Sequence, residues 1–410
     1  MKISIQFLLV LIFVNMLLVG CNKQVDINVN DPSQAIKSNA EALGLLNAKI
    51  TQEGSLANSY IIVFKETVTN VDEEIDQAAK KFGFRVGFKY KNAIKGFSAK
   101  LPDAALNGLR NNPNIALIEQ DQLISSNTTQ TPVPSWGLDR IDQISLPLNA
   151  SYTYAVDGTG VDAYIFDSGI FAEHNEFGGR VRRGYSSIGS ITNWTDQNGH
   201  GTHVAGTVGG TKFGVAKGIN LVAVRVLDAV GSGSTSGVIA GIDWAIVDHT
   251  STPAVGNMSL GGGASTALDN AVNKAISDGI VMCVAAGNNG RSAANFSPAR
   301  VINAITVGAT GTSTNKDAFA IYSNFGSVVD ILAPGTGITS AWILSTTSEN
   351  TISGTSMATP HVAGVAGLYL SKNRTASPAT VQTALKTAAS SNKIASVPKG
   401  TVNKLLFTNY

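Results

Sequence analysis

Ser356 is the residue of this 410-residue chain whose surroundings point most clearly to chemistry. It lies in the string SGTSMATPHVAG (residues 353–364), where a glycine-threonine pair precedes a run of small, mostly apolar residues. This pattern predicts a serine in the first turn of a buried helix, and helix N-termini favour negative charge that develops nearby. A serine hydroxyl is a weak nucleophile at neutral pH. It therefore needs a base within hydrogen-bond reach and an acid that orients the base.

Residues that can serve as base and acid occur upstream. His200 lies in NGHGTHVAG (residues 198–206), where a glycine on either side allows other backbone to approach the imidazole closely. Asp167 ends the strand-like run VDAYIFD (residues 161–167). Its carboxylate is therefore predicted at the tip of a buried strand, where open α/β sheets carry functional groups. The order along the chain is Asp, His, Ser, which is the subtilisin order and differs from those of chymotrypsin and the α/β-hydrolases.

Each of these residues also has an ordinary structural interpretation. An isolated Ser in such a turn is most often a helix cap, an isolated Asp after a strand is a turn residue, and an isolated His is a satisfied polar group. The combination in one order carries the signal, because independent coincidences of this kind are rare.

The three strings and their flanks resemble the subtilases, the subtilisin-like serine proteases, and within them the proteinase K and aqualysin branch. The resemblance implies an α/β fold with three α/β/α layers and a mainly parallel central sheet, and it runs from about Trp136 almost to Tyr410. The supporting strings are WGLDRID (136–142), AVRVLD (223–228), GSGSTSG (231–237), NMSLGG (257–262) and AAGNNG (285–290).

The resemblance also implies a role for each site residue. Ser356 would attack a peptide carbonyl, His200 would take and return the proton, and Asp167 would fix the imidazole tautomer. The side-chain amide of Asn288, together with the backbone N–H of Ser356, would stabilise the oxyanion. No cofactor is implied for this chemistry.

A substrate backbone would add as a strand between two segments, a binding mode that is largely blind to side chains. The pocket for the residue before the scissile bond would have small, uncharged walls, which predicts broad specificity with a preference for apolar or aromatic residues there. The residues implied in substrate binding are Gly233, Ser234, Thr235, Ser259, Leu260, Gly261, Ala286 and Gly287.

A zinc protease and a noncatalytic binding protein are the two alternative function classes. His200 and His203 form H-x-x-H, but the zinc protease motif needs histidines at i and i+4 with a glutamate between them, so we expect His203 to have a structural role. A noncatalytic peptide-binding or adhesion protein on the same fold is the broader alternative. Complete retention of Asp167, His200, Ser356 and Asn288 argues against it, since loss of any one would be its simplest signature.

Composition is consistent with a large enzyme core. The chain is 43% hydrophobic with 42 glycines, and its length predicts more than one domain. The net charge of +2 and the absence of basic blocks argue against nucleic acid as a partner. We expect protein or peptide substrates and a monomeric mature enzyme.

The N-terminus is predicted to direct export from a bacterial cell. Residues 1–21 form a signal peptide that ends in LVGC, which resembles a lipobox and makes Cys21 a candidate for lipidation, so the precursor would be lipid-anchored. A signal anchor is the alternative, although its apolar run is short for a bilayer. If Cys21 is lipidated, Cys283 is left alone, no intrachain disulfide forms, and we expect Cys283 in the core.

Residues 22–55 have the composition of a polar tether, and residues 56–127 are predicted to form a small α+β, ferredoxin-like domain. Its expected elements are strand 60–64, helix 71–81, strands 85–90 and 96–101, helix 103–111 and strand 115–119. The strings YIIVFK (60–65), KGFSA (95–99) and IEQD (118–121) resemble the inhibitory and chaperone propeptide of subtilases. Autocleavage is expected within residues 125–130, which leaves residues 128–410 as the catalytic domain. A ligand-binding ferredoxin-like module is the alternative.

Structural calcium is expected in place of disulfides. The resemblance implies a site at Asp330 with backbone carbonyls near Ile302 and Ala304. Asp139, Asp142 and Gln143 place three oxygen-bearing side chains within five residues and suggest a second site. Solvated surface acids are the alternative for both.

Overall fold

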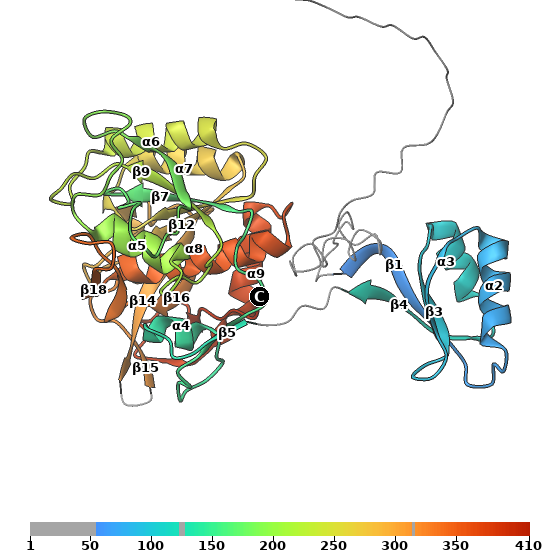
Figure 1. Cartoon of the computed structure of the whole chain (residues 1–410). Helices are drawn as coiled ribbons and strands as arrows, with labels where there is room; N and C mark the ends of the chain where they lie inside the picture. The colour runs from blue at the N-terminus through green and yellow to red at the C-terminus, as the bar shows by residue number, and fades with distance from the viewer. Residues whose placement is uncertain (1–54, 123–127, 314–315) are drawn as a thin grey trace, which may run out of the picture. The chain divides into compact units, whose positions relative to one another are not determined.

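The computed structural model describes residues 55–122, 128–313 and 316–410 (Figure 1). The predicted signal peptide, Cys21 and nearly all of the tether lie outside these residues. Contacts divide the chain into two compact units, with a boundary after Asp121. In the described residues, no helix is both long and apolar enough to cross a membrane.

The first unit is a four-stranded sheet with two helices, in the strand order β2-β3-β1-β4. This is the predicted ferredoxin-like βαββαβ arrangement, and each predicted element is confirmed with small shifts at its ends. Asn70 caps α2 by accepting a hydrogen bond from the Glu73 N–H at 3.3 Å, and Gly83 ends it with φ 69°. The elements are β1 (Ser55–Phe64), α2 (Val71–Phe82), β2 (Val86–Tyr90), β3 (Gly96–Lys100), α3 (Asp103–Arg110) and β4 (Ile115–Gln122).

The second unit is built on a large, mainly parallel sheet. Within the described residues it runs β19-β21-β16-β14-β12-β10-β7-β9-β8, and seven consecutive pairings from β21 to β8 are parallel. The strands are β19 (Ser390–Ser391), β21 (Lys404–Leu405), β16 (Ile331–Pro334), β14 (Ile305–Ser313), β12 (Ile280–Ala285), β10 (Ala254–Met258), β7 (Asp162–Asp167), β9 (Asn220–Arg225) and β8 (Val181–Ser186), with β15 (Lys316–Phe319) and β20 (Ile394–Ala395) off this path.

Helices cover both faces of this sheet, as Figure 1 shows for α6 and α7 on one side and α5 and α8 on the other. Alternate side chains of β7 enter opposite cores: Ile165 packs with the α5 and α8 side, and Phe166 with the α6 and α7 side. The predicted three-layer α/β/α fold is confirmed. The helices are α4 (Trp136–Ile141), α5 (His200–Gly209), α6 (Thr235–Asp248), α7 (Thr266–Ser277), α8 (Thr355–Lys372) and α9 (Pro378–Ala388), with a 3₁₀ turn at Ala293–Asn295.

Three short ribbons complete the second unit: β5 (Thr128–Gln130) with β6 (Tyr152–Tyr154), β11 (Gly262–Gly263) with β13 (Phe296–Ser297), and β17 (Ile338–Ala341) with β18 (Glu349–Ile352).

Five helices of the second unit, α5 to α9, begin in two different ways. Ser234, Ser265 and Ser377 cap α6, α7 and α9 through their own hydroxyls. The residues at the cap positions of α5 and α8 are Gly199 and Gly354, which have no side chain that could accept a hydrogen bond from the helix. The free N–H groups of these two helices therefore need partners from elsewhere.

Candidate active site

Asp167, His200, Ser356 and Asn288 come together at one edge of the large sheet. Asp167 is the last residue of β7, and Asn288 lies three residues after the end of β12 at Ala285. His200 begins α5 and Ser356 is the second residue of α8. Parallel strands place their carboxyl ends at the same edge, which is where open α/β sheets bind ligands.

His200 is held by Asp167. The Nδ1 atom of His200 lies 2.8 Å from Oδ1 of Asp167, and the same carboxylate oxygen accepts the Ser168 N–H at 2.8 Å. Asp167 is completely buried, whereas the His200 side chain is 25% exposed. A Cβ at Gly201 would lie 2.2 Å from the Gly169 carbonyl oxygen, so a glycine is required for this close approach. The contact fixes which ring nitrogen faces the carboxylate and leaves Nε2 for another partner.

The electrostatic environment of His200 favours its protonated form. Burial alone lowers the pKa of the imidazole, but the charge and hydrogen bond of Asp167, with a smaller contribution from the charge of Asp196, outweigh burial, so the pKa is raised. Among the protein atoms described, the second oxygen of Asp167 has no hydrogen-bond partner. Its negative charge is therefore available to stabilise an imidazolium.

Asp196 is a positioning residue that the sequence analysis did not identify. Its Oδ1 accepts hydrogen bonds from the Ser168 hydroxyl and from the N–H groups of Asn198 and Gly199. Its Oδ2 accepts both the N–H and the hydroxyl of Thr202, at 2.8 and 2.6 Å. This buried carboxylate therefore replaces the missing cap of α5 and fixes the turn that carries His200. An acid four residues before a helix-opening histidine was the only available signal.

Ser356 is connected to the neighbouring substrate segment by two hydrogen bonds. Its hydroxyl donates to the Ser259 carbonyl oxygen at 3.1 Å, and its own carbonyl oxygen accepts the Ser259 hydroxyl at 2.8 Å. The second bond is possible because Pro360, inside α8, has no N–H to donate to the carbonyl four residues earlier. In this structure the Ser356 hydroxyl therefore donates to Ser259 and not to His200, and contacts between a nucleophile and its base often tighten only when substrate binds.

Asn288 caps α8 from outside the helix. Its Oδ1 accepts the N–H and the hydroxyl of Thr355, at 2.8 and 2.9 Å. This leaves the amide nitrogen for an acceptor beside Ser356. A Cβ at Gly354 would lie 3.3 Å from that nitrogen, so the glycine keeps the space around the donor open.

Asn324 holds the loop that carries Asn288. Its amide donates to the Ala286 carbonyl oxygen at 2.8 Å and accepts the N–H groups of Asn289 and Arg291, each at 3.0 Å. Gly287 has φ 99°, and a Cβ there would lie 2.4 Å from the Asn324 amide nitrogen. Asn324 is fully buried and was not predicted from the sequence, because its partners lie far from it along the chain.

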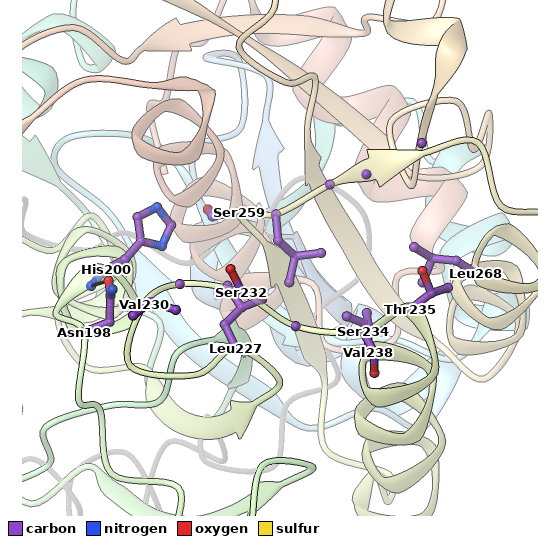
Figure 2. Close-up of a pocket in the computed structure, with 16 residues that line it drawn as sticks. Asn198, His200, Leu227, Val230, Ser232, Ser234, Thr235, Val238, Ser259 and Leu268 are labelled. Atoms are coloured by element: carbon purple, nitrogen blue, oxygen red, sulfur yellow. Dashed lines mark hydrogen bonds between the residues drawn. The ribbon is translucent and has the colours of Figure 1, made fainter.

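A groove of about 530 Å³ runs from His200 between the two predicted substrate segments. Figure 2 shows His200 at one end and Leu268 at the other, with Ser232 and Ser234 between them. Gly233, Thr235, Ser259, Leu260 and Gly261 also line this groove.

A second pocket, of about 360 Å³, adjoins Ser356 and Asn288. Its walls include the predicted residues Leu260, Gly261, Ala286 and Gly287. Phe296 and Ala299 also line it and were not predicted from the sequence. None of its lining residues is charged. The residues that line it are Leu260, Gly261, Gly262, Gly263, Ala285, Ala286, Gly287, Asn288, Asn289, Phe296, Ser297, Ala299, Thr355 and Ser356.

Comparison with known proteins agrees with this geometry. The subtilase family model matches residues 89–406. The chain belongs to the subtilase family.

Individual relatives support the same assignment. The chain is 53% identical over 328 residues to an extracellular serine proteinase of Thermus sp. strain Rt41A, covering 80% of this chain and 79% of the relative. It is 46% identical over 370 residues to the alkaline serine exoprotease A of Vibrio alginolyticus, covering 86% and 68%. A cold-adapted subtilisin-like serine proteinase of known crystal structure aligns with a TM-score of 0.65 and 51% identity, covering 68% of this chain and all of that one. The subtilase described here is a serine proteinase and therefore a hydrolase.

The other histidines of this subtilase near the site are structural in their contacts. His203 is fully buried, its Nε2 lies 3.0 Å from the Ile338 carbonyl oxygen, and burial lowers its pKa to about 4. His361 contacts the Met357 carbonyl oxygen at 2.8 Å, and burial lowers its pKa to about 4 as well. In the described part of the chain, no three His, Cys, Asp or Glu side chains are grouped as metal ligands. Cys283 is buried in β12, and burial raises the pKa of its thiol.

The predicted calcium cluster at Asp139, Asp142 and Gln143 fits a cation in part. Asp142 has one carboxylate oxygen bonded to the Thr153 N–H at 2.8 Å and a second that is buried without a partner in the described residues. Burial, with some contribution from the Asp139 charge, raises the pKa of Asp142 to about 6. Asp139 already accepts the N–H groups of Asn149 and Ala150 and the Gln143 amide. A calcium ion beside Asp142 requires the Gln143 amide to turn so that its oxygen faces the ion.

The predicted calcium site at Asp330 does not fit a cation in the side-chain arrangement of this structure. Oδ1 of Asp330 accepts the ammonium of Lys386 at 2.7 Å, and its Oδ2 accepts the Thr306 N–H at 3.0 Å. The carbonyl oxygens of Ile302 and Ala304 accept the side-chain amide of Gln382, at 3.4 and 3.0 Å. Every oxygen that was predicted to bind calcium at Asp330 therefore already accepts a hydrogen bond.

Proposed function

We propose that this subtilase is an endopeptidase that cleaves peptide bonds through an acyl-enzyme, with Ser356 as nucleophile, His200 as general base and acid, and Asp167 as the acid that orients His200. The observation that carries the proposal is the 2.8 Å contact between His200 and Asp167, at the sheet edge where Ser356 lies in the first turn of α8. The unpartnered oxygen of Asp167 supports its role in stabilising the imidazolium.

The reaction then has two balanced steps. The Ser356 oxygen bonds to the substrate carbonyl carbon while its proton passes to Nε2 of His200, and collapse of the tetrahedral intermediate breaks the C–N bond as that proton moves to the leaving amine. A water molecule next attacks the acyl carbon, gives a proton to His200, and Ser356 leaves with that proton. In both steps the Asn288 amide and the Ser356 N–H donate to the oxyanion.

Specificity for the residue before the scissile bond is assigned to the pocket of about 360 Å³ beside Ser356. Its walls of small residues and Phe296 fit medium to large apolar or aromatic side chains, and its lack of charged lining residues leaves a buried Lys or Glu without an ionic partner. Peptide p-nitroanilides that differ only at this position test the assignment. Phe and Leu are expected to exceed Lys and Glu in kcat/KM, and an equal rate for all four contradicts it.

Residues 56–127 are proposed to act as an inhibitory and folding-assisting propeptide that the enzyme removes itself. The ferredoxin-like unit and its position before the catalytic unit support this. The chain from Asn22 onward and its Ser356→Ala variant test the whole proposal, by mass spectrometry and casein hydrolysis. Only the unmodified chain should shorten by about 105 residues and digest casein, in line with triad catalysis.

The noncatalytic alternative has its own outcome in this experiment. If both chains stay full length and inert although folded, a trace of trypsin is added. Activity that then appears in the unmodified chain alone assigns maturation to another protease, whereas continued inactivity supports a peptide-binding or adhesion role.

We also propose export from a bacterial cell, supported by relatives described as extracellular and by residues 1–21. If Cys21 carries a lipid, the anchor belongs to the propeptide and maturation releases the monomeric enzyme from the membrane. Fractionation with N-terminal sequencing tests this. A mature catalytic domain that remains in the membrane fraction, with an N-terminus near Thr128, excludes such release.

One structural calcium ion is proposed at Asp139, Asp142 and Gln143, where the unpartnered oxygen of Asp142 would contact it. In the Ser356→Ala background, which prevents autolysis, chelation is expected to lower the Tm. Asp142→Asn should remove that response, while Asp278→Asn, at a surface acid beside His249, should keep it. An unchanged Tm after chelation overturns the proposal.

A further inference from the structure

Three oxygen atoms converge at the amino ends of β14 and β16, on the edge opposite the catalytic residues. Two are the carbonyl oxygens of Ile302 and Ala304, which precede β14, and the third is Oδ1 of Asp330, which precedes β16. The two strands are paired here, because the Asp330 N–H donates to the Thr306 carbonyl oxygen at 2.9 Å. Two carbonyls and a carboxylate are the kind of ligands that calcium binds.

Helix α9 supplies the donors for these oxygens. Gln382 and Lys386 are four residues apart and so lie on the same face of the helix. The Gln382 amide donates to both carbonyl oxygens, at 3.4 and 3.0 Å, and the Lys386 ammonium lies 2.7 Å from the carboxylate. Ser377 and Pro378 begin the helix at a fixed residue, which sets this face toward the strands.

We propose that Lys386, assisted by Gln382, is a built-in replacement for a calcium ion at Asp330. The ammonium provides the positive charge, and the amide occupies the lone pairs of the carbonyl oxygens. Calcium can bind only after displacing both side chains, so the unmodified protein binds none at this position. Removing the two side chains leaves three oxygens facing a space without donors, which is a calcium site.

The proposal concerns stability and does not depend on the proposed catalytic function. It is therefore tested in the exported chain (residues 22–410) carrying Ser356→Ala, so that proteolysis cannot affect the readout. The variants are Lys386→Met, Lys386→Met with Gln382→Ala, Lys386→Arg, and each of the first two with Asp330→Asn. Lys404→Met is the matched control, because the Lys404 ammonium donates to the Lys386 carbonyl oxygen at 2.6 Å and touches none of the three oxygens.

The number of calcium ions bound per chain is measured by isothermal titration calorimetry, and the Tm is measured with and without calcium. Any ion at Asp142 contributes equally to every chain, so only differences are interpreted. We expect the double variant to bind one more calcium ion per chain than the unmodified chain and to gain about 5 °C in Tm at a hundredfold excess over its Kd. Asp330→Asn should abolish that gain, whereas Lys386→Arg and Lys404→Met should show none.

Two results overturn the proposal. One is a calcium ion in the unmodified chain that Asp330→Asn removes, which means that Lys386 yields to calcium in solution. The other is a folded double variant that binds no additional ion. If the double variant folds only when calcium is present, folding itself becomes the readout, and loss of this rescue in the Asp330→Asn chain supports the proposal.

Discussion

The two helices that carry His200 and Ser356 are alike in having glycine at the cap position, but the side chains that cap them differ in charge. Both have glycine at the cap position, so both are capped by a side chain from another segment. The cap of α5 is a buried carboxylate, Asp196, and the cap of α8 is a neutral amide, Asn288. A Cβ at Gly199 would meet the Trp342 ring, and one at Gly354 would approach the Asn288 amide, so each glycine makes room for a neighbouring side chain while the cap comes from another segment.

The difference matches the charge that each helix start must tolerate. In the proposed mechanism His200 becomes positive during proton transfer, and the negative charge of Asp196 favours that state. The substrate oxygen beside Ser356 becomes negative in the same mechanism, so a carboxylate there would repel it. Asn288 caps the helix through its oxygen and keeps its nitrogen as a donor. In each case one side chain caps the helix and also stabilises the charge that develops beside it.

Replacing Asn288 should separate the two tasks of the α8 cap and produce the largest effect. Asn288→Asp retains an acceptor for the Thr355 N–H and adds a negative charge that the helix start favours, so the Tm should stay near that of the unmodified chain. It lacks the donor and repels the oxyanion. We therefore expect kcat to fall by more than the roughly 100- to 1000-fold measured for removal of such a donor in subtilisin.

Asn288→Ala is the matched variant, because it loses the donor and the cap together. Its kcat should fall by about 100- to 1000-fold, and its Tm should fall as well. Slow variants are freed of their propeptide by trypsin before kcat is measured. Equal kcat for Asn288→Asp and the unmodified enzyme would mean that Asn288 does not donate to the oxyanion.

The sequence predicted those features that depend on local pattern or on motifs. The predicted helix 71–81 is one such local feature, since Asn70 and Gly83 next to its ends in the sequence cap it, and the strand before Asp167 was predicted from its own apolar run. Asp196 is a partial exception, because its partners Asn198, Gly199 and Thr202 lie within six residues of it along the chain. The positions of Asn324, Lys386 and Gln382 in the structure could not be predicted in this way. Their partners are brought to them by the sheet topology, and periodicity carries no information about contacts between distant segments.

Replacing Asp196 should give a smaller loss of activity and a larger loss of stability. Asp196→Asn removes the charge and places an amide group where the Thr202 N–H and hydroxyl need an acceptor. Hydrogen bonds to charged groups are worth about 1.5–3 kcal/mol each, so the Tm in the Ser356→Ala background should fall by about 5 °C or more. An unchanged Tm would show that the α5 cap is dispensable.

The same substitution should move the pH profile. Asp196 contributes to the raised pKa of His200, so removing its charge lowers that pKa. The enzyme needs neutral His200 as a base, and kcat/KM therefore decreases when the pH drops below this pKa. The acidic limb of the kcat/KM profile for a soluble peptide substrate should shift to lower pH. A shift to higher pH would contradict the electrostatic role given to Asp196.

The finest comparison uses one threonine from each helix. Thr355 and Thr202 are both fully buried, and each donates its hydroxyl to the residue that caps its helix, Asn288 or Asp196. Each hydroxyl also accepts one backbone N–H, that of Gly287 for Thr355 and that of Phe171 for Thr202, so both valine variants should lose about 1–3 kcal/mol of stability. Thr355→Val keeps the N–H bond to Asn288 but frees its amide to turn, so its kcat should also fall by about tenfold. Thr202→Val should leave kcat nearly unchanged. If the two variants lose kcat to the same extent, the caps do not differ in role, whereas a loss of kcat in Thr355→Val alone means that the neutral cap serves the chemistry and the charged cap serves mainly the fold.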